Sequence, residues 1–183
     1  QMYKIKKDKK LISLLRDGRE LYHTQDLGVL WEISNENTLY TTIKRYIKSG
    51  VLFRVHKGLY SIKKIDQIDK INLGLTSLHR YGYLSTESVL VKAGIIFQDI
   101  KYITFVSDIS RKFKINGNHF LVRKMNPIYL YNNAGIYIKN NQRIASTERA
   151  VADMIYFNPK YHFDGGNIIS WEKVKEIKKQ IGY

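Results

Sequence analysis

The sequence predicts an α+β protein, with an N-terminal winged helix-turn-helix over residues 1–64 and a mixed α/β domain over residues 65–183. Two observations predict this class. The first third of the chain reads as helix, short strand, helix, helix and hairpin. The remainder interleaves short helical patterns with β-rich runs, including the hairpin signal Asn116-Gly117. With 183 residues, 44% of them hydrophobic, the chain can bury one core or two small ones.

Capping residues and apolar spacing predict the first two helices. Asp8 is a suitable N-cap for a first helix, and Gly18 can end it. The apolar face of this helix would carry Leu11, Ile12, Leu14 and Leu15. After a short strand over residues 20–22, Thr24 is expected to cap a second helix. That helix would carry Leu27, Leu30 and Trp31.

A third helix over residues 35–49 is predicted between Ser34, its expected cap, and Gly50. Its apolar positions Leu39, Ile43 and Ile47 are spaced four apart, with Tyr46 beside them, so they form one stripe. Residues 51–62 then read as a hairpin that turns at His56-Lys57-Gly58, where glycine can adopt a positive φ.

The helices expected in the second domain also begin at capping residues. Ser85 would cap a helix over residues 86–93, and either Ser146 or Thr147 would cap one that bears Ala150. Ser170 would cap the last helix, and a further helix is expected over residues 68–80. The final helix would bury one face made of Trp171, Val174, Ile177 and Ile181.

The strands of the second domain are indicated by β-rich runs and turn residues. Residues 102–106 form one such run, and residues 112–115 and 119–123 flank Asn116-Gly117. Another run covers residues 135–139 and turns at Asn140-Asn141. Together these runs predict a sheet containing at least one tight hairpin.

The charge balance indicates a polyanionic partner. Thirty-one Lys and Arg face sixteen Asp and Glu, a formal net charge of +15. Lysine and arginine contacts to phosphates release counterions and so favour nucleic acid. The excess is divided between the domains: fourteen cations against six anions in residues 1–64, and seventeen against ten in residues 65–183. An evenly solvated, lysine-rich surface without a nucleic-acid role is the alternative.

The third helix supplies the candidate DNA interface. With its aliphatic stripe committed to the core, its other edge presents Asn35, Asn37, Thr38, Tyr40, Thr41, Lys44, Arg45 and Lys48. The first turns of a recognition helix meet base edges in the major groove, where Asn37 can pair with adenine and Thr38 suits several bases. Lys44, Arg45 and Lys48 are better placed for phosphates. A polar, solvated helix face is the alternative reading.

Two further basic sets accompany this helix. At the hairpin, Arg54, His56 and Lys57 would contact the flanking backbone or the minor groove. In the second domain, a possible extra basic surface on the predicted hairpin contains Arg111, Lys112, Lys114, Arg123 and Lys124. It could extend the DNA footprint, contact a neighbouring protomer's site, or be an ordinary solvated surface.

The sequence offers little support for catalysis. It has no cysteine, no phosphate-binding glycine loop and no nucleophile motif, and its five histidines lack metal-ligand spacing. Arg149 and Asp153 lie four residues apart on a predicted helix, which favours a structural ion pair. We therefore expect no enzyme activity, no cofactor and no metal. We also expect no membrane span or secretory signal, and a cytoplasmic location.

Four segments resemble the AbiEi-type antitoxin and transcriptional regulator family. Residues 55–62 (VHKGLYSI) resemble its R-x-x-x-G-x-Y ending, and residues 83–90 (YLSTESVL) its Y-L-S-x-E-S-A-L helix start. Residues 103–107 (ITFVS) are similar to its I-T-V-V-T strand, and residues 143–153 (RIASTERAVAD) to its A-S-P-E-R-A-L-L-D helix. The order and spacing agree over nearly the whole chain, although Thr147 replaces the usual proline.

The resemblance implies a type IV toxin–antitoxin, abortive-infection system that defends bacteria against phage. The winged helix would bind double-stranded DNA at inverted repeats in its own promoter, with two copies on a palindromic site. The second domain would oppose a nucleotidyltransferase-like toxin without a stable complex. The alternative is an antitoxin or adaptor that acts by direct protein contact, with the winged helix as a scaffold. An RNA-binding regulator is a third possibility, but the sequence lacks an aromatic sheet motif for stacking bases.

Overall fold

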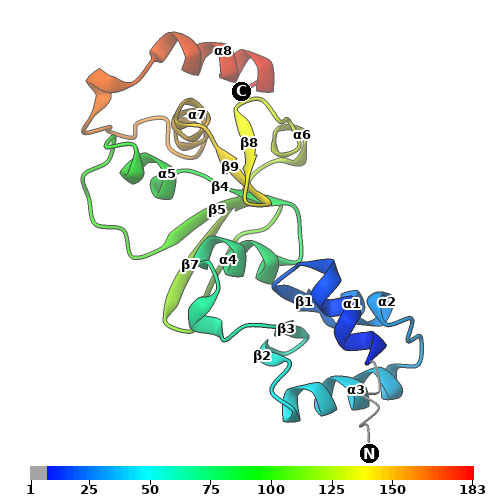
Figure 1. Cartoon of the computed structure of the whole chain (residues 1–183). Helices are drawn as coiled ribbons and strands as arrows, with labels where there is room; N and C mark the ends of the chain where they lie inside the picture. Colours follow the sequence, from blue (N-terminus) through cyan, green and yellow to red (C-terminus); the bar gives the residue numbers. More distant parts are fainter. Residues whose placement is uncertain (1–7) are drawn as a thin grey trace, which may run out of the picture. The chain divides into compact units, whose positions relative to one another are not determined.

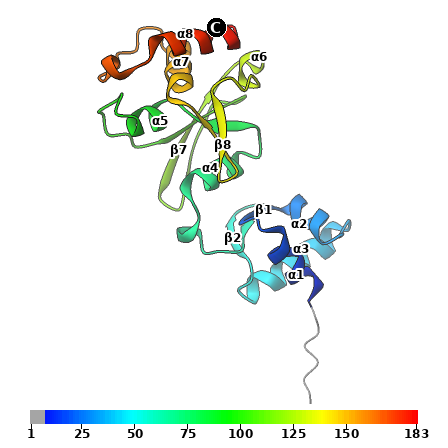
Figure 2. The same ribbon diagram turned by 45° about the horizontal axis from the view of Figure 1, so that its top comes forward.

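The computed structural model describes residues 8–183 and contains two compact units, which divide after Ile68 (Figure 1). The predicted boundary lay at residue 64. Both units mix helices with a sheet, which confirms the predicted α+β class (Figure 2). Each unit is described by itself.

The first unit contains three helices, α1 (Lys9–Asp17), α2 (Thr24–Leu30) and α3 (Glu36–Lys48). As predicted, α1 begins at Asp8, whose carboxylate accepts the backbone N–H groups of Lys10 and Leu11, and ends at Gly18 with φ 77°. The same carboxylate accepts the hydroxyl of Tyr46 at 2.6 Å. The cap of α1 therefore also ties that helix to α3.

Three expectations for these helices are wrong: two caps lie one residue away from the predicted position, and one predicted core residue is exposed. His23, not Thr24, precedes α2, and its backbone N–H donates to the Asp26 carboxylate at 2.7 Å. Asn35, not Ser34, caps α3 and is therefore not a helical residue itself. Leu15 is 67% exposed, because α1 buries only one narrow edge against its neighbours.

A three-stranded antiparallel sheet completes this unit, in the order β1-β3-β2. Its strands are β1 (Leu21–His23), β2 (Phe53–His56) and β3 (Leu59–Ser61). The predicted hairpin is confirmed: the chain turns between β2 and β3, with Gly58 at φ 83°. The core joins all three helices to the sheet through Leu14, Tyr22, Leu27, Trp31, Leu39, Ile43, Tyr46, Leu52 and Tyr60.

The second unit is built on a six-stranded sheet in the order β6-β7-β5-β4-β9-β8. Its strands are β4 (Gly82–Leu84), β5 (Ile103–Ser107), β6 (Arg111–Ile115), β7 (Asn118–Lys124), β8 (Ile136–Lys139) and β9 (Gln142–Ala145). The pairs β4–β9 and β5–β7 are parallel, and the others are antiparallel. Both predicted turns are confirmed, with positive φ at Asn116, Gly117, Asn140 and Asn141.

Helices cover both faces of this sheet (Figure 1). Helix α4 (Lys70–Leu78) packs closely on one face, where a Cβ at Gly74 would lie 2.5 Å from the Phe105 ring. On the other face lie α5 (Glu87–Lys92) and α7 (Thr147–Phe157), with Ser88 and Thr104 bonded to each other. Helices α6 (Pro127–Leu130) and α8 (Trp171–Ile181) complete the unit, and short 3₁₀ turns occupy Ile65–Gln67 and Gly166–Ile168.

Two predicted helix features of this unit also need correction. Ser85 does not cap α5: Thr86 occupies that position with φ 50°, while the Ser85 hydroxyl donates to Asp153 at 2.7 Å. Trp171 is 43% exposed, so it does not share the buried edge of α8 with Val174 and Ile181. Of the two caps considered for α7, Ser146 is the one whose hydroxyl accepts the Arg149 backbone N–H.

Arg149 and Asp153 form the predicted ion pair, and both side chains are fully buried. The Arg149 guanidinium donates to Asp153 at 2.8 Å, to the Asn132 and Ala134 carbonyls at 2.9 Å, and to the Tyr83 hydroxyl at 2.9 Å. This cation therefore joins α7 to β4 and to the segment that precedes β8.

Candidate nucleic-acid interface

Helix α3 separates a buried edge from an exposed one. Leu39, Ile43 and Tyr46 are at most 6% exposed. All eight side chains predicted to face DNA are exposed: Asn35, Asn37, Thr38, Tyr40, Thr41, Lys44, Arg45 and Lys48. The helix therefore presents amide, hydroxyl and cationic groups together on one side, because its aliphatic stripe is used by the core.

The first turn of α3 uses some of these groups internally. The Asn35 side-chain oxygen accepts the Thr38 backbone N–H at 2.9 Å and the Thr38 hydroxyl at 3.1 Å. The Thr41 hydroxyl donates to the Asn37 carbonyl at 2.8 Å. Within residues 8–183, no hydrogen bond engages the side-chain amide of Asn37. Asn37 is therefore the amide of this edge that is ready for a bidentate contact, whereas Asn35 is committed to the cap.

The second half of α3 carries the cations. Lys44 and Lys48 lie four residues apart and so share a side, and Arg45 holds its guanidinium 5.4 Å from the centre of the Tyr46 ring. No salt bridge involves these three cations within the described part of the chain. The positive charges of Lys44 and Lys48 are therefore available to an external anion, whereas Arg45 also acts on the Asp8 carboxylate.

The β2–β3 hairpin adds three exposed basic side chains, Arg54, His56 and Lys57. The turn is held from outside the hairpin, because the Thr24 backbone N–H donates to the Gly58 carbonyl at 3.0 Å. The start of α2 thus fixes the tip of the hairpin within the first unit.

The basic set predicted on the second unit does not form one cluster. In the β6–β7 register, Lys112 and Lys114 share a face, whereas Arg111 points to the opposite face. Arg123 forms an ion pair with Glu87, half-buried beside the Phe157 ring. Lys124 is exposed at the end of β7. The expectation of a single surface is wrong, because side chains alternate between faces and Arg123 already has a carboxylate partner.

The structure instead gathers a group that the sequence did not suggest. Lys101, Tyr102 and His119 lie with Lys112 and Lys114: the Lys112 ammonium is 5.5 Å from the Tyr102 ring centre, and the Tyr102 and His119 rings are 5.8 Å apart. Partial burial and the ammonium groups of Lys101 and Lys114 lower the pKa of His119. The parallel β5–β7 pairing brings these residues together. Sequence alone does not specify that pairing, so no local pattern could have found the group.

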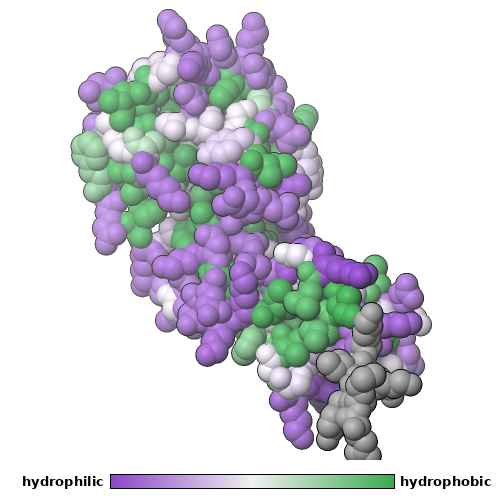
Figure 3. All heavy atoms as spheres, in the orientation of Figure 1, coloured by the Kyte–Doolittle hydropathy of each residue, from purple (hydrophilic) through white to green (hydrophobic). Residues whose placement is uncertain are grey.

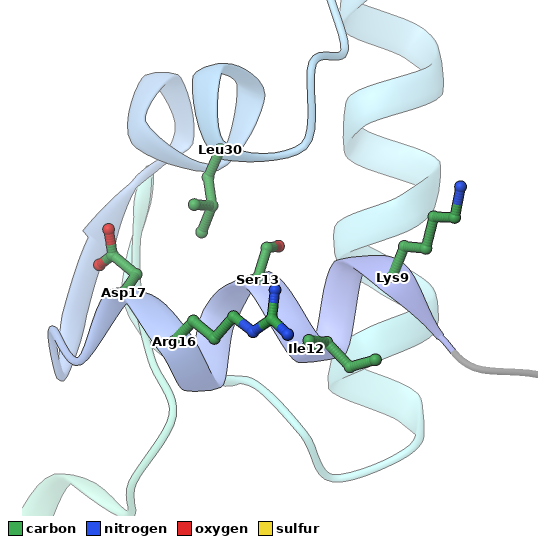
Figure 4. Close-up of a pocket in the computed structure, with 6 residues that line it drawn as sticks. All are labelled: Lys9, Ile12, Ser13, Arg16, Asp17 and Leu30. Atoms are coloured by element: carbon green, nitrogen blue, oxygen red, sulfur yellow. The ribbon is translucent and has the colours of Figure 1, made fainter.

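An open pocket lies between α1 and α2 of the first unit (Figure 4). Its walls are Lys9, Ile12, Ser13, Arg16, Asp17 and Leu30. The exposed side chains of Leu15 and Val29, 67% and 81% accessible, belong to the same two helices. Figure 3 shows hydrophobic residues gathered over this part of the unit. The pocket thus offers an apolar floor with charged ends.

Residues 8–183 contain no group of three or more His, Asp or Glu side chains placed to hold a metal ion. None of the helices in this range combines the length and apolar character that a bilayer crossing requires.

The fold is similar to that of a protein of known structure. The class is a two-unit α+β protein, and its chain path is similar to that of the RV2827C protein from Mycobacterium tuberculosis. The TM-score with that crystal structure is 0.54 at 14% sequence identity, over 93% of this chain and 70% of the other. No family model and no curated protein sequence matches the chain. At this identity the likeness shows the fold alone.

Proposed function

We propose that this protein is a DNA-binding transcriptional autorepressor and the antitoxin of a bacterial toxin–antitoxin, phage-defence operon. The first unit would act as a winged helix-turn-helix, with α3 as the recognition helix and the β2–β3 hairpin as the wing. The observation that carries the proposal is the division of α3 into a buried aliphatic edge and an exposed edge of amide, hydroxyl and cationic groups. The +15 net charge supports it.

In this proposal the residues of α3 divide their roles by position. Asn37, near the helix start, reads a base edge in the major groove, because its amide can both donate to and accept from adenine. Lys44, Arg45 and Lys48 bind phosphates and set the orientation of the helix on the duplex. Arg54, His56 and Lys57 place the wing on the flanking backbone or in the minor groove.

The biological setting comes from the AbiEi-type resemblance of residues 55–62, 83–90, 103–107 and 143–153. The proposed target is a set of inverted repeats in the protein's own promoter, bound by two copies. The proposed functional partner is a nucleotidyltransferase-like toxin that is opposed without a stable complex. We place the protein in the cytoplasm and assign it no enzymatic role and no cofactor.

The test is binding to the DNA upstream of its own gene, compared with a random duplex of equal length across a salt series. We expect the upstream DNA to bind at least tenfold more tightly, since specific binding exceeds non-specific binding by about 10³-fold or more in typical regulators. Equal affinity for both duplexes at every salt concentration would contradict repression at that promoter.

The pocket between α1 and α2 favours a second candidate, an antitoxin or adaptor that works by direct protein contact. Ile12 and Leu30 give it an apolar floor, and Lys9 and Arg16 lie at its rim. Size-exclusion chromatography of the protein mixed with the product of the neighbouring gene separates the two candidates. A stable complex without DNA binding would favour direct contact, and DNA binding without a complex would favour repression.

A further inference from the structure

The second unit carries a cationic and aromatic surface that the proposed DNA interface on α3 does not use. We call it the sheet-face cluster and define it as Lys101, Tyr102, Lys112, Lys114 and His119. It lies on the β5, β7 and β6 end of the six-stranded sheet.

Sheet register brings Lys112, Lys114 and His119 to one face, and Lys101 and Tyr102 directly precede β5. Lys112 pairs with Leu121 and Lys114 with His119 in the antiparallel β6–β7 ladder. Leu121 pairs with Thr104 in the parallel β5–β7 ladder, so this is the face on which α5 contacts Thr104. Lys112 and Lys114 are nevertheless exposed, so the helices leave this end of the face uncovered. Two residues along a strand separate the two ammonium-bearing positions by ~7 Å.

The charge of the cluster is not neutralised within the described residues. No salt bridge there involves Lys101, Lys112 or Lys114, whereas Arg80, Arg123 and Arg149 of the same unit each have a carboxylate partner. Partial burial lowers the pKa of His119, and the positive charges of Lys101 and Lys114 lower it further. Like charges held this close on a rigid sheet favour an external polyanion.

The aromatic ring distinguishes between kinds of polyanion. Tyr102 lies in the middle of the cluster, with Lys112 over its ring and the edge of His119 against it. The face of a six-stranded sheet is wider than the single helix or two-stranded ribbon that the major groove admits. Single-stranded nucleic acid suits it better, because phosphates can bind the lysines while an unpaired base stacks on an aromatic ring.

We infer that the sheet-face cluster is a binding site for single-stranded nucleic acid, separate from the proposed duplex interface on α3. In this site Lys101, Lys112 and Lys114 bind phosphates. When Lys112 moves from the Tyr102 ring to a phosphate, the ring becomes a stacking surface for one base. The inference goes beyond the proposed function and does not depend on it.

The experiment measures the affinity of the full chain for fluorescent oligouridylate and oligothymidylate of about 10 nucleotides, a length within the usual range of such sites. The test variant is Lys112→Ala with Lys114→Ala. The matched control is Lys173→Ala with Lys175→Ala, which removes the same charge from exposed positions of α8. Comparison of the two oligonucleotides shows whether the site prefers RNA or DNA.

We expect the test variant to bind single strands at least tenfold more weakly, and the control to change less than twofold. The slope of log affinity against log salt should fall by about 1.4 in the test variant, since each phosphate contact contributes about 0.7 on single strands. Equal losses in test and control variants would overturn the inference, because they would indicate adsorption to general positive charge.

Two further measurements probe the geometry rather than the charge. Tyr102→Leu keeps every cation and should weaken single-strand binding about tenfold through lost stacking. The His119 pKa, followed by NMR, should rise when the oligonucleotide binds, because a neighbouring phosphate favours the protonated ring. Unchanged affinity in Tyr102→Leu together with an unchanged His119 pKa would overturn the assignment of this surface.

A final comparison keeps this inference distinct from the proposal for α3. Lys44→Ala should weaken duplex binding and leave single-strand binding unchanged, and the Lys112/Lys114 variant should do the reverse. Retained thermal unfolding shows that each variant is folded. Loss of both activities in the Lys112/Lys114 variant would mean that one continuous duplex site exists and that the single-strand site does not.

Discussion

Arg149 in the second unit and the cations of α3 in the first unit show two opposite uses of positive charge. Arg149 is fully buried, and its guanidinium donates to Asp153, to three backbone carbonyls and to the Tyr83 hydroxyl. Lys44 and Lys48 are exposed and have no ion pair among the described residues. The net charge alone therefore overstates how many cations are available for binding, because some of the cations stabilise the fold instead.

The largest effect is expected for Arg149→Met, which leaves the Asp153 carboxylate buried without its cation. Breaking such a pair costs about 3–5 kcal/mol of unfolding free energy. Urea denaturation measures this loss. Arg80→Met is the matched control, because the Arg80–Asp108 pair is largely solvated and should contribute about 0–1 kcal/mol. Equal effects of the two substitutions would remove the distinction between structural and available charge.

Asn37→Ala is expected to lose about 1–3 kcal/mol of binding free energy on the upstream DNA and little on a random duplex. The reason is that Asn37 presents an unengaged amide, whereas Asn35 is committed to capping α3. Anisotropy titrations on both duplexes measure the difference. The same loss on both duplexes would show that Asn37 contacts the backbone instead of a base.

Asp8→Ala is expected to lower stability by about 1 kcal/mol, because it removes the cap of α1. The Tyr46 hydroxyl and the capped N–H groups lower the pKa of Asp8 below its ordinary value of 3.8. The contribution of this carboxylate is therefore present above pH 3.8 and disappears as the pH falls through the lowered pKa. Denaturation of wild type and variant between about pH 2 and 7 checks the direction of this pH dependence. A difference that grows on acidification would contradict it.

The hydrogen bond between Tyr46 and Asp8 also affects Tyr46. Burial and the bond to Asp8 raise the pKa of Tyr46 to about 12. Tyr46→Phe should therefore reduce the acid dependence of stability that Asp8 confers, which a double-mutant cycle with Asp8→Ala measures. Additive effects of the two substitutions would show that the contact carries no coupling.

The smallest effect is expected for Lys44→Ala, which should weaken binding to all duplexes and lower the salt slope by about one. Lys173→Ala on α8 is the control and should leave the slope unchanged. A salt series on the upstream and random duplexes measures both. An unchanged slope for Lys44→Ala would remove this lysine from the proposed phosphate contacts.

The sequence predicted well those elements that a few neighbouring residues determine. Asp8 and Gly18 mark the two ends of α1, and Asn116-Gly117 and Asn140-Asn141 form tight turns. Each of these features depends on a few neighbouring residues. The pair Arg149 and Asp153 was predictable for the same reason. The strand β4 was not predicted, because it depends on pairing with the distant strands β5 and β9. The helix α6 was missed although its signal is local, with Asn126 as its cap and Pro127 as its first residue.

The candidate site divides in the same way. The exposed edge of α3 follows from helical periodicity, so its residues could be named from the sequence. The sheet-face cluster brings Lys101 and Tyr102 next to Lys112, Lys114 and His119 through strand pairing, which no local pattern specifies. The Arg123–Glu87 pair was missed for a similar reason, since the two residues meet only in the folded sheet.

The bond from the Thr24 backbone N–H to the Gly58 carbonyl has a consequence for the hairpin it anchors. A loop tip tethered before any encounter has few alternative conformations to give up, so its entropy loss on docking is small. Arg54, His56 and Lys57 therefore approach a partner from a prepared backbone, with only their side chains left to settle. Selectivity at this tip would then reside in side-chain length and charge, and exchange of these three residues should retune it without disturbing the turn.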